Sequence, residues 1–309
     1  MAELPLAPVP TQPRPEGTRV AAWRPAAEPA RGLRWLVLMP QQPALVAAAA
    51  PLVLIVLICL AAPLWPIPDP LRGDIVSRYL PPGAPEHPLG TDQLGRDVLS
   101  RLIWGGRISI ATGVAANIIV AVLGVCIGLV AGYFGGKIDG VLMRVTDVLL
   151  AFPGLLLALA MLAFLGPSLI NMVIAVTISS VPSKVRFVRG QVLQARQLKF
   201  VEAARILGYG HRRIMFAEIL PYVMPLILTL TALHATGFFL ATAGLSLLGL
   251  GVEPPNPDWG SMVGQGIAAI YEAPHAMLAP TVMITVIAVC FNVIGDEVQK
   301  ILSPKGQVN

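Results

Sequence analysis

Residues 108–133 read ISIATGVAANIIVAVLGVCIGLVAGY, an apolar stretch without a single charged side chain. A helix of this length extends about 39 Å, because each residue adds about 1.5 Å. The hydrocarbon core of a bilayer is about 30 Å thick. Buried strands have apolar runs of only about 4 to 8 residues. The stretch therefore predicts a helix that crosses a membrane.

Five further apolar runs of comparable length occupy residues 44–64, 145–165, 169–188, 222–250 and 277–294. Hydrophobic residues make up 55% of the 309 residues and charged residues 13%, against about 25% charged in soluble domains. Such a chain cannot cover itself with polar groups. We expect an all-α integral membrane protein with six transmembrane helices.

The two ends of the chain flank these runs with polar sequence. Residues 1–42 are rich in proline and contain five arginines without helical periodicity, which favours a disordered tail. A first transmembrane helix is expected at 43–65 and a second tail at 297–309. Pro63 disfavours signal cleavage after Ala62, so the first helix is expected to stay uncleaved.

Charge distribution orients the predicted helices. With six spans, one side holds both termini and the 189–221 connection, and it carries 17 of the 22 basic residues and nine of the 17 acids. The other side carries five basic residues and eight acids, a net charge of −3. Lysine and arginine accumulate on the cytoplasmic side of membrane proteins. Both termini are therefore predicted to be cytoplasmic.

The same asymmetry explains the basic pI near 9.4 without nucleic acid as a partner, since no basic stretch is interleaved with stacking aromatics. The three cysteines lie within the apolar runs and have no paired spacing, and the four histidines are scattered. No metal site is predicted from such spacing.

The connection at residues 189–221, RGQVLQARQLKFVEAARILGYGHRRIMFAEILP, is unusually long. Helix-forming residues lead to a break at Gly208 and Gly210, where glycine permits a positive φ, and a second helical stretch follows. His211 and two arginines open that second helix, where basic charge opposes the helix dipole. Either an external partner binds there, or these cations only enforce membrane orientation.

The pattern EAA, three residues, glycine, ten residues, ILP resembles the EAA loop of ABC importer permeases. In that family the loop forms a coupling helix that docks into a cytoplasmic ATPase. The resemblance implies that Glu202 anchors the contact, that the two alanines permit close packing and that Gly208 supplies the bend. The implied coupling residues are Glu202, Ala203, Ala204, Gly208, Gly210, Ile219, Leu220 and Pro221.

The stretch HPLGTDQLGRD at 87–97, continued by SRL at 100–102 and GRIS at 106–109, resembles the dipeptide, oligopeptide and nickel branch of this family, specifically its C-type permease subunit. Helical offsets would pair the charges in a short polar helix within an external segment, 66–107. The resemblance implies contact with an external binding protein, or an external gate. The residues concerned are Asp92, Arg96, Asp97, Arg101 and Trp259, the last of which is otherwise expected as an interfacial anchor.

Matches to this branch continue at Arg144, Asp147, Phe152 and Pro153 and along residues 249–260, within a permease core expected at 108–296. An ion pair between Arg144 and Asp147 is expected at the membrane rim. Where family members often carry a tryptophan and a tyrosine, residues 181–187 read VPSKVRF. The geometry of the fourth span is left open by that departure.

Two other function classes fit the sequence less well. A proton-coupled secondary transporter needs an ionisable group inside the membrane or matching interrupted repeats, and the predicted span centres contain no acid. An intramembrane hydrolase needs a motif such as HExxH or GxSxG, and neither string occurs. Neither class is favoured.

The sequence also lacks the GxxxxGK[ST] motif that cradles nucleotide phosphates. With no catalytic residue predicted, no cofactor and no metal are expected on this chain, and ATP and Mg would bind partner subunits. The resemblance implies a heterodimer with a homologous permease, two ATPase subunits and an external binding protein in the bacterial cytoplasmic (inner) membrane. Peptides are the expected substrates, with glutathione, a nickel chelate or another small solute as alternatives.

Overall fold

The computed structural model describes residues 43–302, so the two predicted tails lie outside the described residues, apart from the end of the last helix. Within this range the chain is helical, with only isolated bridges and no strand. The main helices are α2 (Pro43–Leu60), α3 (Val98–Phe134), α4 (Gly136–Leu150), α5 (Gly154–Leu165), α6 (Leu169–Ala195), α9 (Leu220–Leu247), α10 (Trp259–Ile267) and α11 (Pro274–Leu302). The predicted all-α architecture is confirmed.

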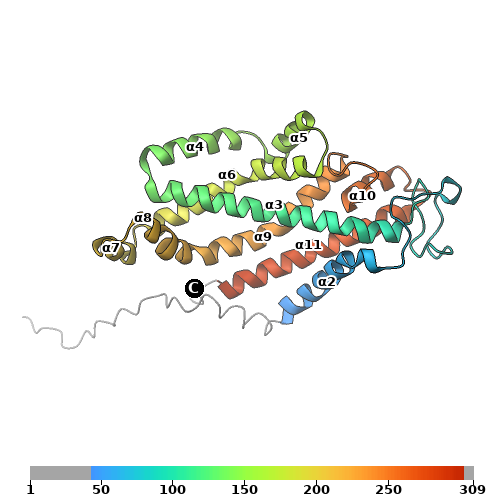
Figure 1. The fold of residues 1–309 in the computed structure, drawn as a ribbon, viewed down its shortest axis with the longest axis horizontal. Coiled ribbons are helices and arrows are strands. Elements are labelled where there is room, and N and C mark those ends of the chain that lie inside the picture. The colour runs from blue at the N-terminus through green and yellow to red at the C-terminus, as the bar shows by residue number, and fades with distance from the viewer. Residues whose placement is uncertain (1–42, 303–309) are drawn as a thin grey trace, which may run out of the picture.

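The long helices run roughly side by side in one elongated bundle (Figure 1). The connection between α6 and α9, with α7 (Lys199–Ile206) and α8 (His211–Arg213), lies at one end, and α10 and the loops after α2 lie at the other. We call these the α7 end and the α10 end. The start of α2 and the end of α11 both point toward the α7 end (Figure 1).

Among residues 43–302, four helices are long and apolar enough to cross a membrane: α2, α3, the continuous helix His211–Leu247 and α11. The pair of α4 and α5 makes a fifth if counted as one span. The remaining predicted span, 169–188, lies in α6, which is 27 residues long but includes Lys184 and Arg186. Many apolar side chains on these helices face outward, as a bilayer or a partner subunit requires.

The third predicted span, 145–165, is not one straight helix. It falls across α4 and α5, which are bent by 84° relative to each other. Pro153 lies at the break, and proline both lacks a backbone N–H and disfavours helical geometry at the residue before it. The prediction of a single continuous helix was therefore wrong, for a reason that Pro153 supplies.

The short polar helix predicted around residues 92–101 is also absent. Residues 91–97 form turns and bridges, and the only helical turn between residues 66 and 97 is a 3₁₀ turn, Ile75–Ser77 (η4). Arg101 belongs instead to the first turn of α3, which starts ten residues before the apolar run. The Asp97 side chain caps α3 by accepting a hydrogen bond from the Ser100 amide at 2.7 Å.

A glycine stripe on α3 brings this helix very close to α6. A Cβ added to any of the three glycines would lie 2.4 to 2.8 Å from a side-chain carbon of α6, closer than real Cβ contacts. Small residues at four-residue spacing let membrane helices approach in this way. The facing pairs are Gly124 with Lys184, Gly128 with Val188, and Gly132 with Val192.

Candidate functional site

The predicted coupling loop, 189–221, forms a helix, a sharp turn and a second helix at the α7 end (Figure 1). The second helix begins with α8, continues through a π-helical stretch, Ile214–Ile219, and runs without a break into α9. Isolated π-turns within helices are common at functional sites. Any displacement of the loop therefore acts directly on a long apolar helix.

Gly208 makes the turn. Its φ is +78°, a value that glycine adopts at no steric cost. The Gly208 amide donates to the Arg205 carbonyl at 2.9 Å, and the Tyr209 amide donates to the Ala204 carbonyl at 3.0 Å. This pair of bonds is the Schellman motif, which satisfies the last carbonyls of α7.

Gly210 behaves differently from the prediction. It caps the start of α8 with φ −67° and ψ 155°, an extended conformation open to most residues. A Cβ added to Gly210 would also meet nothing within 4 Å. The structure therefore gives a conformational reason for glycine at 208 and none at 210.

The short helix α7 has one buried face and one exposed face. Val201 and Ala204 pack into a core cluster that also includes Ile214 and Ile219. Glu202 and Ala203 lie on the exposed face. The two alanines of the motif thus differ, since Ala204 packs within this chain while Ala203 remains available to a partner.

The exposed face continues into apolar side chains. Ile206 is 81% exposed and Leu207 is 69% exposed, although each would gain about 1.5 to 3 kcal/mol on full burial. Leu220 is half-buried and Pro221 exposed at the start of α9, so only Ile219 of the ILP motif is a core residue. The loop thus presents an acid and two large apolar side chains together.

Polar contacts fix the loop against the end of α3. The Tyr133 hydroxyl lies 2.9 Å from His211 Nδ1, and Arg196 Nη1 donates to the Tyr133 carbonyl at 2.8 Å. The Arg213 guanidinium stacks 3.8 Å from the centre of the Tyr209 ring. Two basic residues of α8, His211 and Arg213, therefore have partners inside the chain. The sequence pattern did not identify these partners.

Ion pairs also connect α6 to α4. Arg189 donates to both oxygens of Asp139, at 2.5 and 2.6 Å, and Arg186 pairs with Asp147. Asp147 had been predicted to pair with Arg144 of its own helix, and that prediction was wrong. Arg186 is 39 residues away in sequence, so helical spacing could not identify it.

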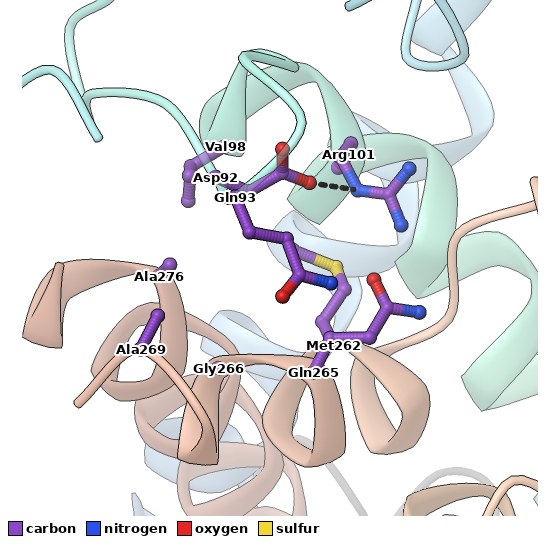
Figure 2. Close-up of a pocket in the computed structure, with 9 residues that line it drawn as sticks. All are labelled: Asp92, Gln93, Val98, Arg101, Met262, Gln265, Gly266, Ala269 and Ala276. Atoms are coloured by element: carbon purple, nitrogen blue, oxygen red, sulfur yellow. Dashed lines mark ion pairs between the residues drawn. The ribbon is translucent and has the colours of Figure 1, made fainter. Parts of the chain in front are cut away.

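The five candidates at the α10 end lie around the starts of α3 and α10, and two of them pair with Asp92. Arg96 Nε donates to Asp92 Oδ2 at 2.7 Å, and Arg101 Nε lies 3.5 Å from the same oxygen. Figure 2 shows the Asp92–Arg101 pair beside Gln93, Met262 and Gln265 at the rim of a small crevice. Arg96 Nη2 donates to Gln265 Oε1 of α10 at 3.0 Å.

Burial decides what these residues can touch. Asp92, Arg96, Asp97 and Arg101 are all buried, and Trp259 has no exposed surface. The Trp259 indole donates to the Leu102 carbonyl at 2.7 Å, so it is a core residue and the interfacial-anchor prediction was wrong. The Asp92 side chain, 12% exposed at the rim of the crevice, is the most accessible of the five, and their predicted contact with a binding protein stays a prediction.

Several known proteins resemble this chain in amino-acid sequence. A family model for the binding-protein-dependent transport system inner membrane component matches residues 124–307. The glutathione transport system permease protein GsiD of Pectobacterium atrosepticum is 40% identical over 219 residues, covering 71% of this chain and 73% of that protein. A Brucella suis protein, provisionally named as a peptide transport system permease, is 40% identical over 261 residues, covering 83% of this chain and 87% of its own.

Among solved structures, the inward-facing MetNI methionine ABC transporter aligns with a TM-score of 0.50 and 18% identity, covering 67% of this chain and 98% of that chain. At this identity the likeness concerns the fold alone. The family match spans more than half of this chain, and the 40% identical relatives are covered over more than two thirds of their length. The chain therefore belongs to the binding-protein-dependent inner membrane components, the permeases of ABC importers.

Proposed function

We propose that this chain forms one half of the translocation path of an ATP-driven importer of di- and oligopeptides, and that the loop 189–221 transmits the ATPase cycle to the membrane helices. The exposed face of α7 carries this proposal. Glu202, Ile206 and Leu207 project from a helix whose other face is anchored in the core. A groove on a cytoplasmic ATPase would cover the apolar pair and pair with the carboxylate.

The roles follow from position. Glu202 lies in the first turn of α7, where an acid is favoured by the helix dipole, and the described residues offer it no side-chain partner. Gly208 sets the direction in which α7 leaves the bundle. Ala204 of α7 and Ile219, which directly precedes α9, share one buried core cluster, so that a pull on α7 reaches a membrane helix.

The complex implied is a heterodimer with a homologous permease, two ATPase subunits that bind ATP and Mg, and an external binding protein. This chain would then be a non-catalytic subunit of the cytoplasmic (inner) membrane with both termini cytoplasmic. Because the start of α2 and the end of α11 both point toward the α7 end (Figure 1), a fluorescent protein fused to either terminus should fold and fluoresce. A periplasmic reporter active at the same position would refute this orientation.

The coupling role is tested in proteoliposomes with the partner subunits and the binding protein. Glu202→Arg should leave the complex assembled but lower uptake per ATP hydrolysed, because it reverses the charge offered to the ATPase. Gly208→Pro should do the same by forbidding the positive φ. Glu272→Arg, an exposed acid at the α10 end, is the matched control. Normal coupling in both loop variants would refute the role.

Glutathione is the second candidate substrate, because relatives at 40% identity are named as glutathione permeases. External binding proteins select the ligand in such systems, so the cognate binding protein decides between the candidates. Calorimetric titration of that protein with dipeptides, glutathione and a nickel chelate should give tight binding to a dipeptide. Tight binding to glutathione alone would replace the peptide assignment.

A further inference from the structure

A groove at the α10 end lies outside everything assigned above. It is formed by the segment that follows α2, by one face of α3 and by the loop before α10, and its empty space, mouth included, is about 1330 Å³. Its polar and aromatic lining consists of Trp65, Asp69, Trp104, Arg107 and Asn256. Prolines and apolar residues make up most of the rest.

The groove has a fixed wall. Ser100 Oγ donates to the Pro68 carbonyl at 2.5 Å, and Arg101 Nη1 donates to the Pro70 carbonyl at 3.2 Å. Both donors are buried residues of α3. The segment that carries Asp69 is therefore held against α3 at a defined distance, and the groove is a built feature of the fold.

The groove lies at a membrane boundary. Arg107 directly precedes the apolar run that starts at Ile108, and Trp65 follows the end of α2 by five residues. Tryptophan favours this level of a bilayer, where headgroups meet hydrocarbon, and an arginine near the end of a membrane helix extends its charge to the same level. Outward-facing apolar side chains of α2 and of the 3₁₀ turn Ala62–Leu64 lead up to the groove, with Leu60 59% exposed and Leu64 86% exposed.

Two charges in the groove are available to a ligand. The Arg107 guanidinium stacks on Trp104, 5.1 Å from the ring centre, and among residues 43–302 it has no hydrogen bond or ion pair. Asp69 uses one oxygen to accept from the Leu71 amide at 2.8 Å, and no ion pair joins it to Arg107 within the same range. An arginine without a counterion suits a phosphate ligand, because the guanidinium presents paired donors to phosphate oxygens.

We propose that this groove binds the headgroup of an amine-bearing phospholipid, with the phosphate on Arg107 and the ammonium on Asp69. A zwitterionic headgroup satisfies both charges at once, whereas a purely anionic one leaves Asp69 facing negative charge. The lipid tails would continue along the exposed apolar face of α2. A free dipeptide carries the same pair of charges but has no tails to use that face.

The test is native mass spectrometry of the delipidated full chain titrated with dioctanoyl phosphatidylethanolamine. Arg107→Gln should weaken binding about tenfold, the size of one hydrogen-bonded charge contact. Arg78→Gln is the matched control, because Arg78 also stacks on an aromatic ring at 5.1 Å, Tyr79, but lies outside the groove. It should bind within twofold of wild type.

Asp69→Asn changes an exposed side chain and keeps an oxygen that can accept from the Leu71 amide. It should abolish the preference for phosphatidylethanolamine over dioctanoyl phosphatidylglycerol while keeping phosphate binding. Equal binding by wild type and Arg107→Gln, or an unchanged lipid preference in Asp69→Asn, would overturn the proposal. Displacement of the lipid by dialanine at millimolar concentration would also overturn it, since the ligand would then be a peptide.

Discussion

Replacing Gly128 by alanine tests the close packing of α3 on α6. The new Cβ would lie 2.7 Å from Val188 Cβ and 2.8 Å from the Val185 carbonyl oxygen. Neither atom is the end of a flexible side chain, so the helices must separate. Overpacking of this kind costs about 1 to 3 kcal/mol, while alanine for glycine within a helix gains about 1 kcal/mol.

Gly140→Ala is the matched control, because Gly140 is also helical, in α4, and an added Cβ there meets nothing within 4 Å. It should stabilise the chain by about 0.8 to 1 kcal/mol. Since the helix-propensity gain is common to both variants, their difference isolates the overpacking cost of about 1 to 3 kcal/mol.

The measurement is the free energy of unfolding of the purified chain in mixed micelles, from SDS titrations followed by circular dichroism. Gly128→Ala should unfold at a lower SDS fraction than wild type, and Gly140→Ala at the same or a higher one. Equal effects of the two substitutions would show that α3 and α6 do not approach as described. ATPase coupling measured on the same variants would show whether separation of the two helices reaches the loop.

Three further outcomes are expected. Trp259→Phe removes the indole bond to the Leu102 carbonyl and should cost about 0.5 to 1.5 kcal/mol in the same titration; no loss would contradict the buried bond. The bidentate pair of Arg189 and Asp139 joins α6 to α4, so the double variant that exchanges the two residues should recover the stability lost in either single variant. A double variant no more stable than the single variants would argue against this ion pair. Lys184 is a buried cation that donates to Thr231 Oγ1 at 2.9 Å, and a charge at membrane depth costs about 2.5 to 3.5 kcal/mol. The Lys184→Met variant should therefore unfold no more easily than wild type. A large loss of stability would show that the bond to Thr231 outweighs the cost of burying the charge.

Apolar runs and short-range motifs predicted much of this fold. The helix class, the family and the turn at Gly208 followed from residues close together in sequence, and the family assignment is confirmed. The glycine stripe was missed, although its four-residue spacing stands in the stretch 124–132 and is a recognised signal for close helix packing. The break at Pro153 was missed because the hydrophobic run continues through it.

Other features depend on contacts that no local pattern encodes. Trp259 reads as an interfacial residue until its partner Leu102, 157 positions away, is known. Asp147 has an arginine at helical spacing on its own helix, yet Arg186 of α6 lies closer. For the same reason the polar residues before α3 were expected on a surface, and the fold instead covers them with α10.

Polar contacts join the loop 189–221 to the end of α3, and they link movement of the loop to movement of that helix. Because Tyr133 of α3 contacts both His211 and Arg196, the loop cannot shift without a change at that helix end. Coupling between two sites is reciprocal, so a factor by which one event favours the other must act equally in reverse. Under the proposed function, the preference that a docked ATPase imposes on the membrane helices equals the preference that the helices impose on docking. Substrate-loaded and empty transporters would then bind the ATPase with different affinities.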